Sequence, residues 1–264
     1  VPGCLENLLT YVDILTKARQ ETYKHDYMKM TDLRKEGMTF IVSGHYYFPK
    51  LLDILEKQKH KDLSIVNELK SVQDTNFVTS STLQIDGTPL CRNDLLWFYI
   101  DRTTRKKAAL PQWFREEFKP LSNIEPKGTG NFDILKRNIE RHEIGDNFEK
   151  LSKTSFSVTK DDVDHFGHFN HSYHLREMIK NIVQNFPRSS SITNIENLPL
   201  KTVDILYKRE AKLDDDLTIQ SSFLQNDPNC REIVLQSSIS KDAGLLTQME
   251  LKLDSSNQIV NAKL

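Results

Sequence analysis

The feature that most constrains this chain is a strongly amphipathic segment in its second half, followed at once by alternating strands. Its apolar residues recur at steps of three and four, which places them on one face of a helix: Leu175, Met178, Ile179, Ile182, Val183 and Phe186. Four strands with period-two alternation are predicted after it: 203–208, 217–223, 233–239 and 249–253. A further half-buried strand is predicted before it, around residues 155–159. A helix this apolar on one face needs a sheet to cover it, so the pattern predicts an α+β unit of antiparallel strands around one helix.

The first half of the chain repeats this order without the first strand. A helix stripe runs from Leu5 to Leu15. Asp86-Gly87 is a hairpin signal between the last two of the four strands predicted in this half. Strands are predicted after the helix at residues 38–47, 63–72, 77–85 and 95–101. Residues 51–61 are predicted to form a short helical insertion. The chain therefore predicts two copies of one plan.

The stretch from residue 111 to about residue 150 interrupts the repeat with prolines and glycines, followed by a charged helical segment. We place the connection between the two copies there. The predicted domains are an N-terminal unit at 1–125, a linker at 126–147, and a C-terminal unit at 148–264 that carries the candidate site.

Composition narrows the class of protein. The chain has 264 residues, with 28% charged and 38% hydrophobic, which is typical of a soluble globular protein. A net charge of −1 argues against a nucleic-acid surface, and the apolar runs are far too short to span a membrane. The three cysteines are widely spaced, so we expect ordinary reduced thiols, no metal site and no cofactor. We expect the cytoplasm or an organelle matrix rather than secretion, although a sequence that begins at Val1 does not show what preceded it.

Two short segments carry residues suited to acyl-transfer chemistry. Asp164 and His168 flank Gly167 just before the amphipathic helix, and Glu210 ends the strand that follows it. A carboxylate can act as a general base or a nucleophile, and an imidazole can orient it or move a proton. Gly167 lets the backbone approach a substrate closely. We expect the backbone N–H groups of Gly167 and His168, at the start of the helix, to bind a developing oxyanion.

These segments resemble the hotdog-fold thioesterases, in the double-hotdog form of the acyl-ACP and acyl-CoA enzymes. The resemblance covers nearly the whole chain. It is sharpest at a D-x-F-G-H-x-N pattern and a Y-x-R-E strand end: Asp164, Phe166, Gly167, His168 and Asn170, then Tyr207, Arg209 and Glu210.

The resemblance implies a tandem hotdog, with two antiparallel sheets each wrapped around a long central helix. It implies an acyl-thioester hydrolase of fatty-acid metabolism that acts on acyl-CoA or acyl carrier protein. Asp164, His168 and Glu210 fall on catalytic positions. The other residues of the two patterns would bind substrate: Phe166, Gly167, Asn170, Tyr207 and Arg209. Such chains can also assemble into homo-oligomers.

The sequence departs from the plant-type pattern at two positions. Phe166 stands where that group has asparagine, although bacterial-type relatives also have a phenylalanine or leucine there. His171 stands where many relatives have a second asparagine. Aligning the two copies places Pro49 opposite Glu210, so the alignment predicts one site per chain, in the C-terminal unit.

Each feature also has an ordinary structural explanation. An aspartate before a helix is often only an N-cap, and Glu210 can be a surface ion-pair partner. The basic residues near the motif can bind CoA phosphates or an acidic carrier protein, or can simply form a solvated face: Lys201, Lys208, Arg209 and Lys212.

Two alternatives to hydrolysis stay open. A catalytically inactive double hotdog could serve as a binding or scaffold subunit of a larger assembly. A hotdog hydratase is the other alternative, but the chain lacks the asparagine-proline of the hydratase motif.

Overall fold

The computed structural model describes residues 4–25, 27–48, 63–122, 148–163, 167–186, 195–224, 232–242 and 244–255. The chain divides into two compact units. One consists of residues 13–132, and the other of residues 1–12 with 133–264. The division at residue 132 lies inside the predicted linker, while the first twelve residues group with the C-terminal unit.

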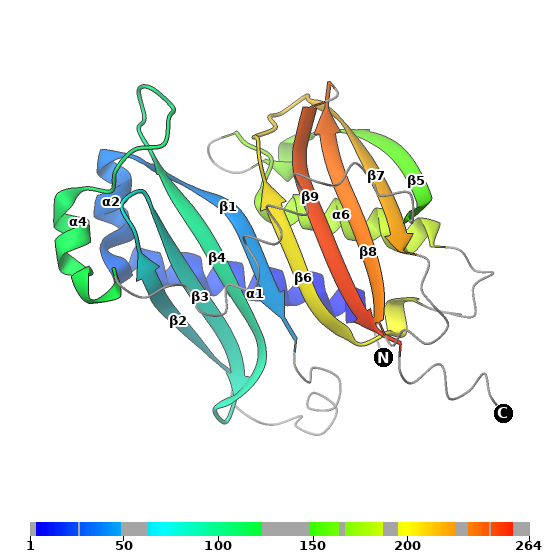
Figure 1. The fold of residues 1–264 in the computed structure, drawn as a ribbon, viewed down its shortest axis with the longest axis horizontal. Helices are drawn as coiled ribbons and strands as arrows, with labels where there is room; N and C mark the ends of the chain where they lie inside the picture. The colour runs from blue at the N-terminus through cyan, green and yellow to red at the C-terminus, as the bar shows by residue number, and fades with distance from the viewer. Residues whose placement is uncertain are drawn as a thin grey trace. The chain divides into compact units, whose positions relative to one another are not determined.

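The N-terminal unit contains four antiparallel strands in the order β2-β3-β4-β1 (Figure 1). Their bounds are Met38–Tyr47 for β1, Leu63–Val72 for β2, Asn76–Ile85 for β3 and Thr88–Ile100 for β4. The predicted hairpin is confirmed, because Asp86 and Gly87 join β3 to β4 with positive φ angles of 47° and 74°. Two residues with positive φ suit the twist of a tight hairpin.

Helices close the core of this unit on one face of its strands. They are the end of α1 (Cys4–Lys24), then α2 (Met30–Glu36) and α4 (Gln112–Glu117). Phe114 of α4 is fully buried and packs with Phe77 of β3, whose ring stacks on Trp97 at a centroid distance of 5.9 Å. The sequence pattern did not reveal α2 or α4, and α4 lies in the stretch that was expected to interrupt the fold. Residues 51–61, the predicted insertion, lie outside the described residues.

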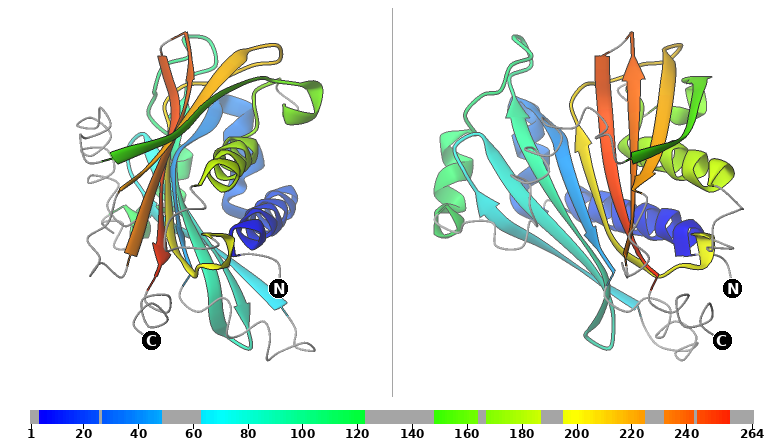
Figure 2. Two further views of the ribbon diagram at one scale, coloured as in Figure 1. Left: turned by 90° about the vertical axis from the view of Figure 1, so that its right-hand side faces the viewer. Right: turned by 45° about the vertical axis from the view of Figure 1, so that its right-hand side comes forward.

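The C-terminal unit contains five antiparallel strands in the order β6-β9-β8-β7-β5. Their bounds are Phe148–Ser157 for β5, Leu200–Tyr207 for β6, Asp216–Leu224 for β7, Glu232–Lys241 for β8 and Gly244–Asp254 for β9. Helix α6 (His171–Asn185) crosses one face of these strands and contacts β5, β7, β8 and β9 (Figure 2). Its apolar stripe accounts for this packing, since Leu175, Met178 and Ile182 are completely buried.

The repeat inferred from the sequence is confirmed in the strand orders. β7-β8-β9-β6 of one unit corresponds to β2-β3-β4-β1 of the other, and β5 adds a strand beside β7. Among the described strands, β2 has no such neighbour. The α+β class with antiparallel strands is confirmed, but the described strands are not resolved into the two separate sheets that were expected.

None of the helices in the described parts of the chain is both long and apolar enough to cross a membrane.

Candidate active site

Two of the three predicted catalytic residues meet in the C-terminal unit. His168 Nε2 lies 3.6 Å from Glu210 Oε2, and the two side chains are 18% and 30% exposed. They come from segments on either side of α6, so only the fold brings them together. The pair is shielded on several sides, yet a solute can reach it. An imidazole beside a carboxylate in such a place can exchange protons with a bound substrate or water.

Backbone hydrogen bonds hold these two segments side by side. The Phe169 N–H donates to the Ala211 carbonyl at 2.8 Å, and His168 is bridged to Lys212 as an antiparallel pair. On the Glu210 side, the Lys208 N–H donates to the Leu246 carbonyl at 2.7 Å and fixes the chain as it leaves β6. The side-chain pair therefore rests on main-chain bonds between the two segments and on a main-chain bond to β9.

The turn before α6 needs a glycine. Gly167 has φ +76°, a conformation that other residues adopt at a strain of roughly 1–2 kcal/mol. The helix itself begins only at His171. The expectation that the Gly167 and His168 N–H groups lie at the helix start is therefore wrong, because the turn places them ahead of it.

Asn170, predicted to bind substrate, is the N-cap of α6. Its Oδ1 accepts from the Ser172 N–H and from the Ser172 hydroxyl, both at 3.1 Å. Asp162 also makes local bonds, since its carboxylate accepts from the Thr159 N–H at 2.9 Å and from its hydroxyl at 2.6 Å. An aspartate before α6 was considered as its N-cap. Asp162 is instead the third residue of a capping box in the short turn at 160–162, whose N-cap is Thr159.

Tyr207 and Arg209, which precede Glu210 in the chain, contact groups at α6 and β9. The Tyr207 hydroxyl donates to the His171 carbonyl at 3.1 Å and ties the end of β6 to the first residue of α6. The Arg209 guanidinium lies over Gly244 at the start of β9. Both residues have evident positioning roles, and their predicted contacts with substrate stay predictions.

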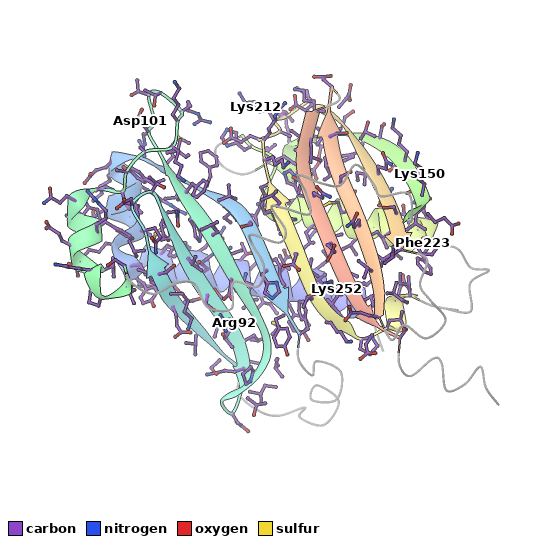
Figure 3. All side chains as sticks on the ribbon, in the orientation of Figure 1. Arg92, Asp101, Lys150, Lys212, Phe223 and Lys252 are labelled. Carbon is purple, nitrogen blue, oxygen red and sulfur yellow. The ribbon has the colours of Figure 1, made fainter. Side chains whose placement is uncertain are left out.

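The four basic residues considered for phosphate binding do not form one group. Lys201 pairs with Glu232 at 3.2 Å and with Asp254 at 3.7 Å. It lies near the start of β6, about 20 Å along the strand from the Tyr207 end. Figure 3 shows Lys212 beyond the end of the strands at which β6 finishes. Lys252 of β9 lies toward the end at which β6 begins. Lys208 and Lys212 are exposed near Glu210, so only these two remain suited to meet an anionic carrier.

The structure adds one residue that the sequence reasoning missed. His174, in the first turn of α6, is 3% exposed and its Nδ1 lies 2.6 Å from Thr247 Oγ1 of β9. Burial lowers the pKa of His174 to about 3, against a smaller opposing effect of a hydrogen bond with the Phe169 backbone. Its ring centroid lies 4.3 Å from that of Phe169. This neutral imidazole therefore braces the backbone next to His168 against β9. Its place on the apolar stripe, one turn before Met178, was the available signal.

Three predicted positions lie outside the described residues. These are Asp164, the third catalytic candidate, Phe166, and Pro49, which was aligned with Glu210. Their roles stay predictions from the sequence.

Comparison with known proteins gives a clear result for the fold. No family model matches the sequence, and no curated protein matches it. Solved structures do match. A protein from Lactobacillus plantarum assigned as an oleoyl thioesterase has a TM-score of 0.71 at 13% identity, over 94% of this chain and 88% of its own. The 12:0-ACP thioesterase from Umbellularia californica has a TM-score of 0.65 at 12% identity, over 93% and 86%. An acyl-ACP thioesterase from Bacteroides thetaiotaomicron has a TM-score of 0.57 at 13% identity, over 93% and 88%.

These matches extend over both units, so the chain has the double-hotdog fold of thioesterases, as predicted. At identities of 12–13% the likeness concerns the fold. Function has to be argued from the site, since one fold can host different activities.

Proposed function

We propose that this protein is a thioester hydrolase whose catalytic centre includes Glu210 and His168. The observation that carries the proposal is their 3.6 Å contact at a partly exposed position of a thioesterase-type fold. An isolated surface ion pair contributes little stability. A backbone arrangement that joins two segments around such a pair is more readily explained by chemistry.

In the proposed reaction, the Glu210 carboxylate accepts a proton from water as the water oxygen attacks the thioester carbonyl carbon. The tetrahedral intermediate then expels the thiolate, and the C–S bond breaks. His168, beside the carboxylate, relays the proton to the departing sulfur. The products are a carboxylic acid and a free thiol, so the atoms and charges balance. General acid–base assistance of this kind contributes about 10²–10⁴ in rate.

Asp164 is proposed as a second carboxylate of this centre, on the sequence pattern alone. The described residues on either side of it are joined, because Val163 and Phe169 form a bridge and the Asn170 N–H donates to the Asp162 carbonyl at 2.9 Å. Whether Glu210 or Asp164 accepts the proton is decided by comparing Glu210→Gln with Asp164→Asn.

The carrier of the acyl group is proposed to be CoA or acyl carrier protein. Two of the similar structures are described as acyl-ACP thioesterases. Lys208 and Lys212 could contact the phosphate groups that both carriers present near the thioester arm.

The test is thiol release from acyl-CoAs of increasing chain length and from the matching acyl carrier protein thioesters. Hydrolysis of at least one series supports the proposal and identifies the carrier. If neither series is hydrolysed at any length, the binding or scaffold alternative replaces it.

A further inference from the structure

The N-terminal unit contains a buried, positively charged cluster that the proposed chemistry does not use. Arg19, on α1, is 3% exposed, and among the described residues no carboxylate is in ion-pair contact with it. Arg19 contacts Thr16 Oγ1 at 3.5 Å and the Trp97 ring, whose centroid lies 5.7 Å from the guanidinium carbon. Burying a charge without a counter-charge is unfavourable by several kcal/mol, about the scale of a whole domain's stability.

A second guanidinium approaches the same place. Arg34, half-buried on α2, lies over the Tyr23 ring at 5.4 Å, and that ring meets Trp97 edge-on at 6.4 Å. Burial lowers the pKa of Arg34, and the Arg19 charge lowers it further. Burial likewise raises the pKa of Tyr23, and the two arginines oppose that rise. Two mutually repelling cations therefore surround one buried phenol.

Polar side chains from four strands face this position. Asn67, Ser81, Asn93 and Tyr46 stand directly opposite one another across β2, β3, β4 and β1, so they share one face of the strands. The Asn67 amide donates to Thr22 Oγ1 of α1 at 2.8 Å, which shows that this face meets α1.

Several groups here are left without partners. Among the described residues, the buried atoms that lack a hydrogen bond include Arg19 Nη1 and Asn67 Oδ1. The Tyr23 hydroxyl and Asn93 Oδ1 have no hydrogen bond of good geometry either, although Tyr23 lies beside Thr79, and Asn93 beside Tyr46. Such groups in a folded protein call for an explanation, because each loses its hydration on burial. The opposite face of β4 provides a contrast, since the buried Asp94 is paired there with Arg92 at 2.7 Å.

We propose that the cluster of Arg19, Tyr23, Arg34, Asn93 and Trp97 is a binding site for a carboxylate with an apolar body. A planar carboxylate matches the guanidinium fork and accepts from the Tyr23 hydroxyl. Trp97 and the Phe77 ring stacked on it would cover the apolar part. A water carried with the carboxylate can donate to the amide oxygens of Asn67 and Asn93. A monovalent carboxylate is favoured over phosphate, whose second charge is more costly to desolvate. The site lies in the N-terminal unit and goes beyond the proposed hydrolysis.

The experiment measures the melting temperature of the full chain with hexanoate, hexanol or inorganic phosphate. Hexanoate at about a hundred times its Kd should raise the melting temperature by roughly 5 °C, whereas hexanol and phosphate should not. Arg19→Met should abolish the shift and raise the melting temperature without ligand, because it removes the uncompensated charge. Arg115→Gln, an exposed arginine of the same unit, is the matched control and should respond as the wild type does.

The result that overturns the proposal is a hexanoate shift that persists in Arg19→Met, or an equal shift with hexanol or phosphate. If Arg19→Met does not fold, Tyr23→Phe replaces it and should weaken hexanoate binding about tenfold, as expected for a lost hydrogen bond to a charged group. Undiminished binding in Tyr23→Phe would then refute the site. The shift must also persist in Glu210→Gln. Loss of the shift in Glu210→Gln would place hexanoate at the proposed active site and refute the N-terminal site. The hydrolase proposal is tested independently, by thiol release.

Discussion

Lowering the pH should destabilise this protein through one buried histidine. His174 is 3% exposed beneath the turn that carries His168, and burial lowers its pKa from 6.5 to about 3. The unfolded chain therefore binds one more proton than the folded chain between these two values. Stability from this residue is fully present above pH 6.5 and is lost progressively as the pH falls toward 3.

The magnitude follows from the proton linkage. Within the window, each pH unit changes the free energy of unfolding by about 1.4 kcal/mol per proton. Between pH 7 and pH 5 the unfolded state gains most of its proton while folded His174 stays neutral, which gives a loss of about 2 kcal/mol. Because pH 5 lies well above the folded pKa, any folded value below about 4 leads to the same loss.

The assay is urea unfolding of the wild type and of His174→Gln at a series of pH values. Other groups titrate in both proteins, so the difference between the two curves isolates residue 174. The stability advantage of the wild type over the variant should shrink by about 2 kcal/mol from pH 7 to pH 5. His25→Gln, which alters an exposed histidine, is the matched control for the substitution itself. A difference curve that is flat between pH 7 and pH 5 would show that His174 takes up its proton equally in the folded and unfolded states, and its role as a neutral brace would be wrong.

Three further predictions concern stability and are checked by denaturant or thermal unfolding. Asn170→Ala should lower the free energy of unfolding by about 1 kcal/mol, because it removes the N-cap of α6 that accepts from the Ser172 N–H, and Asn170→Asp should restore most of this loss. An equal loss in both variants would exclude capping as the cause. Gly167→Ala should lose about 1–2 kcal/mol through backbone strain alone, since nothing crowds the added carbon, and an unchanged midpoint would show that the turn relaxes. Phe114→Ala should lose about 3–5 kcal/mol, in line with a fully buried aromatic residue of the core; a loss below 1 kcal/mol would mean that α4 does not belong to that core.

Local patterns predicted the strands of both units because each strand alternates one buried face with one polar face. β1 and β2 begin and end at the predicted residues, and the Asp86-Gly87 turn fixed the hairpin between β3 and β4. By contrast, α2 and α4 are short. A helix of six or seven residues shows too few turns for periodicity, and its stability comes from residues such as Phe114 that fill the core.

The candidate site was predictable in part. The order of residues around Gly167 and the carboxylate at the end of β6 indicated His168 and Glu210, and the structure brings these two together. The start of α6 was placed too early, since a positive φ at Gly167 inserts a turn before the Asn170 cap. His174 was missed because the buried face of the helix was assigned from its apolar residues alone, although a histidine one turn before Met178 lies on that same face.

In the proposed mechanism the contact between Glu210 and His168 carries catalysis, and thiol release by matched variants distinguishes this role from a structural one. Glu210→Gln and His168→Ala should each lower kcat by about 10²–10⁴ with melting temperatures close to that of the wild type. Glu177→Gln breaks an ordinary helical ion pair, 2.5 Å from Lys180, in the same unit and should keep full activity. If the wild type releases thiol and both site variants release it equally fast, the pair is only structural and the assignment of the active site is refuted.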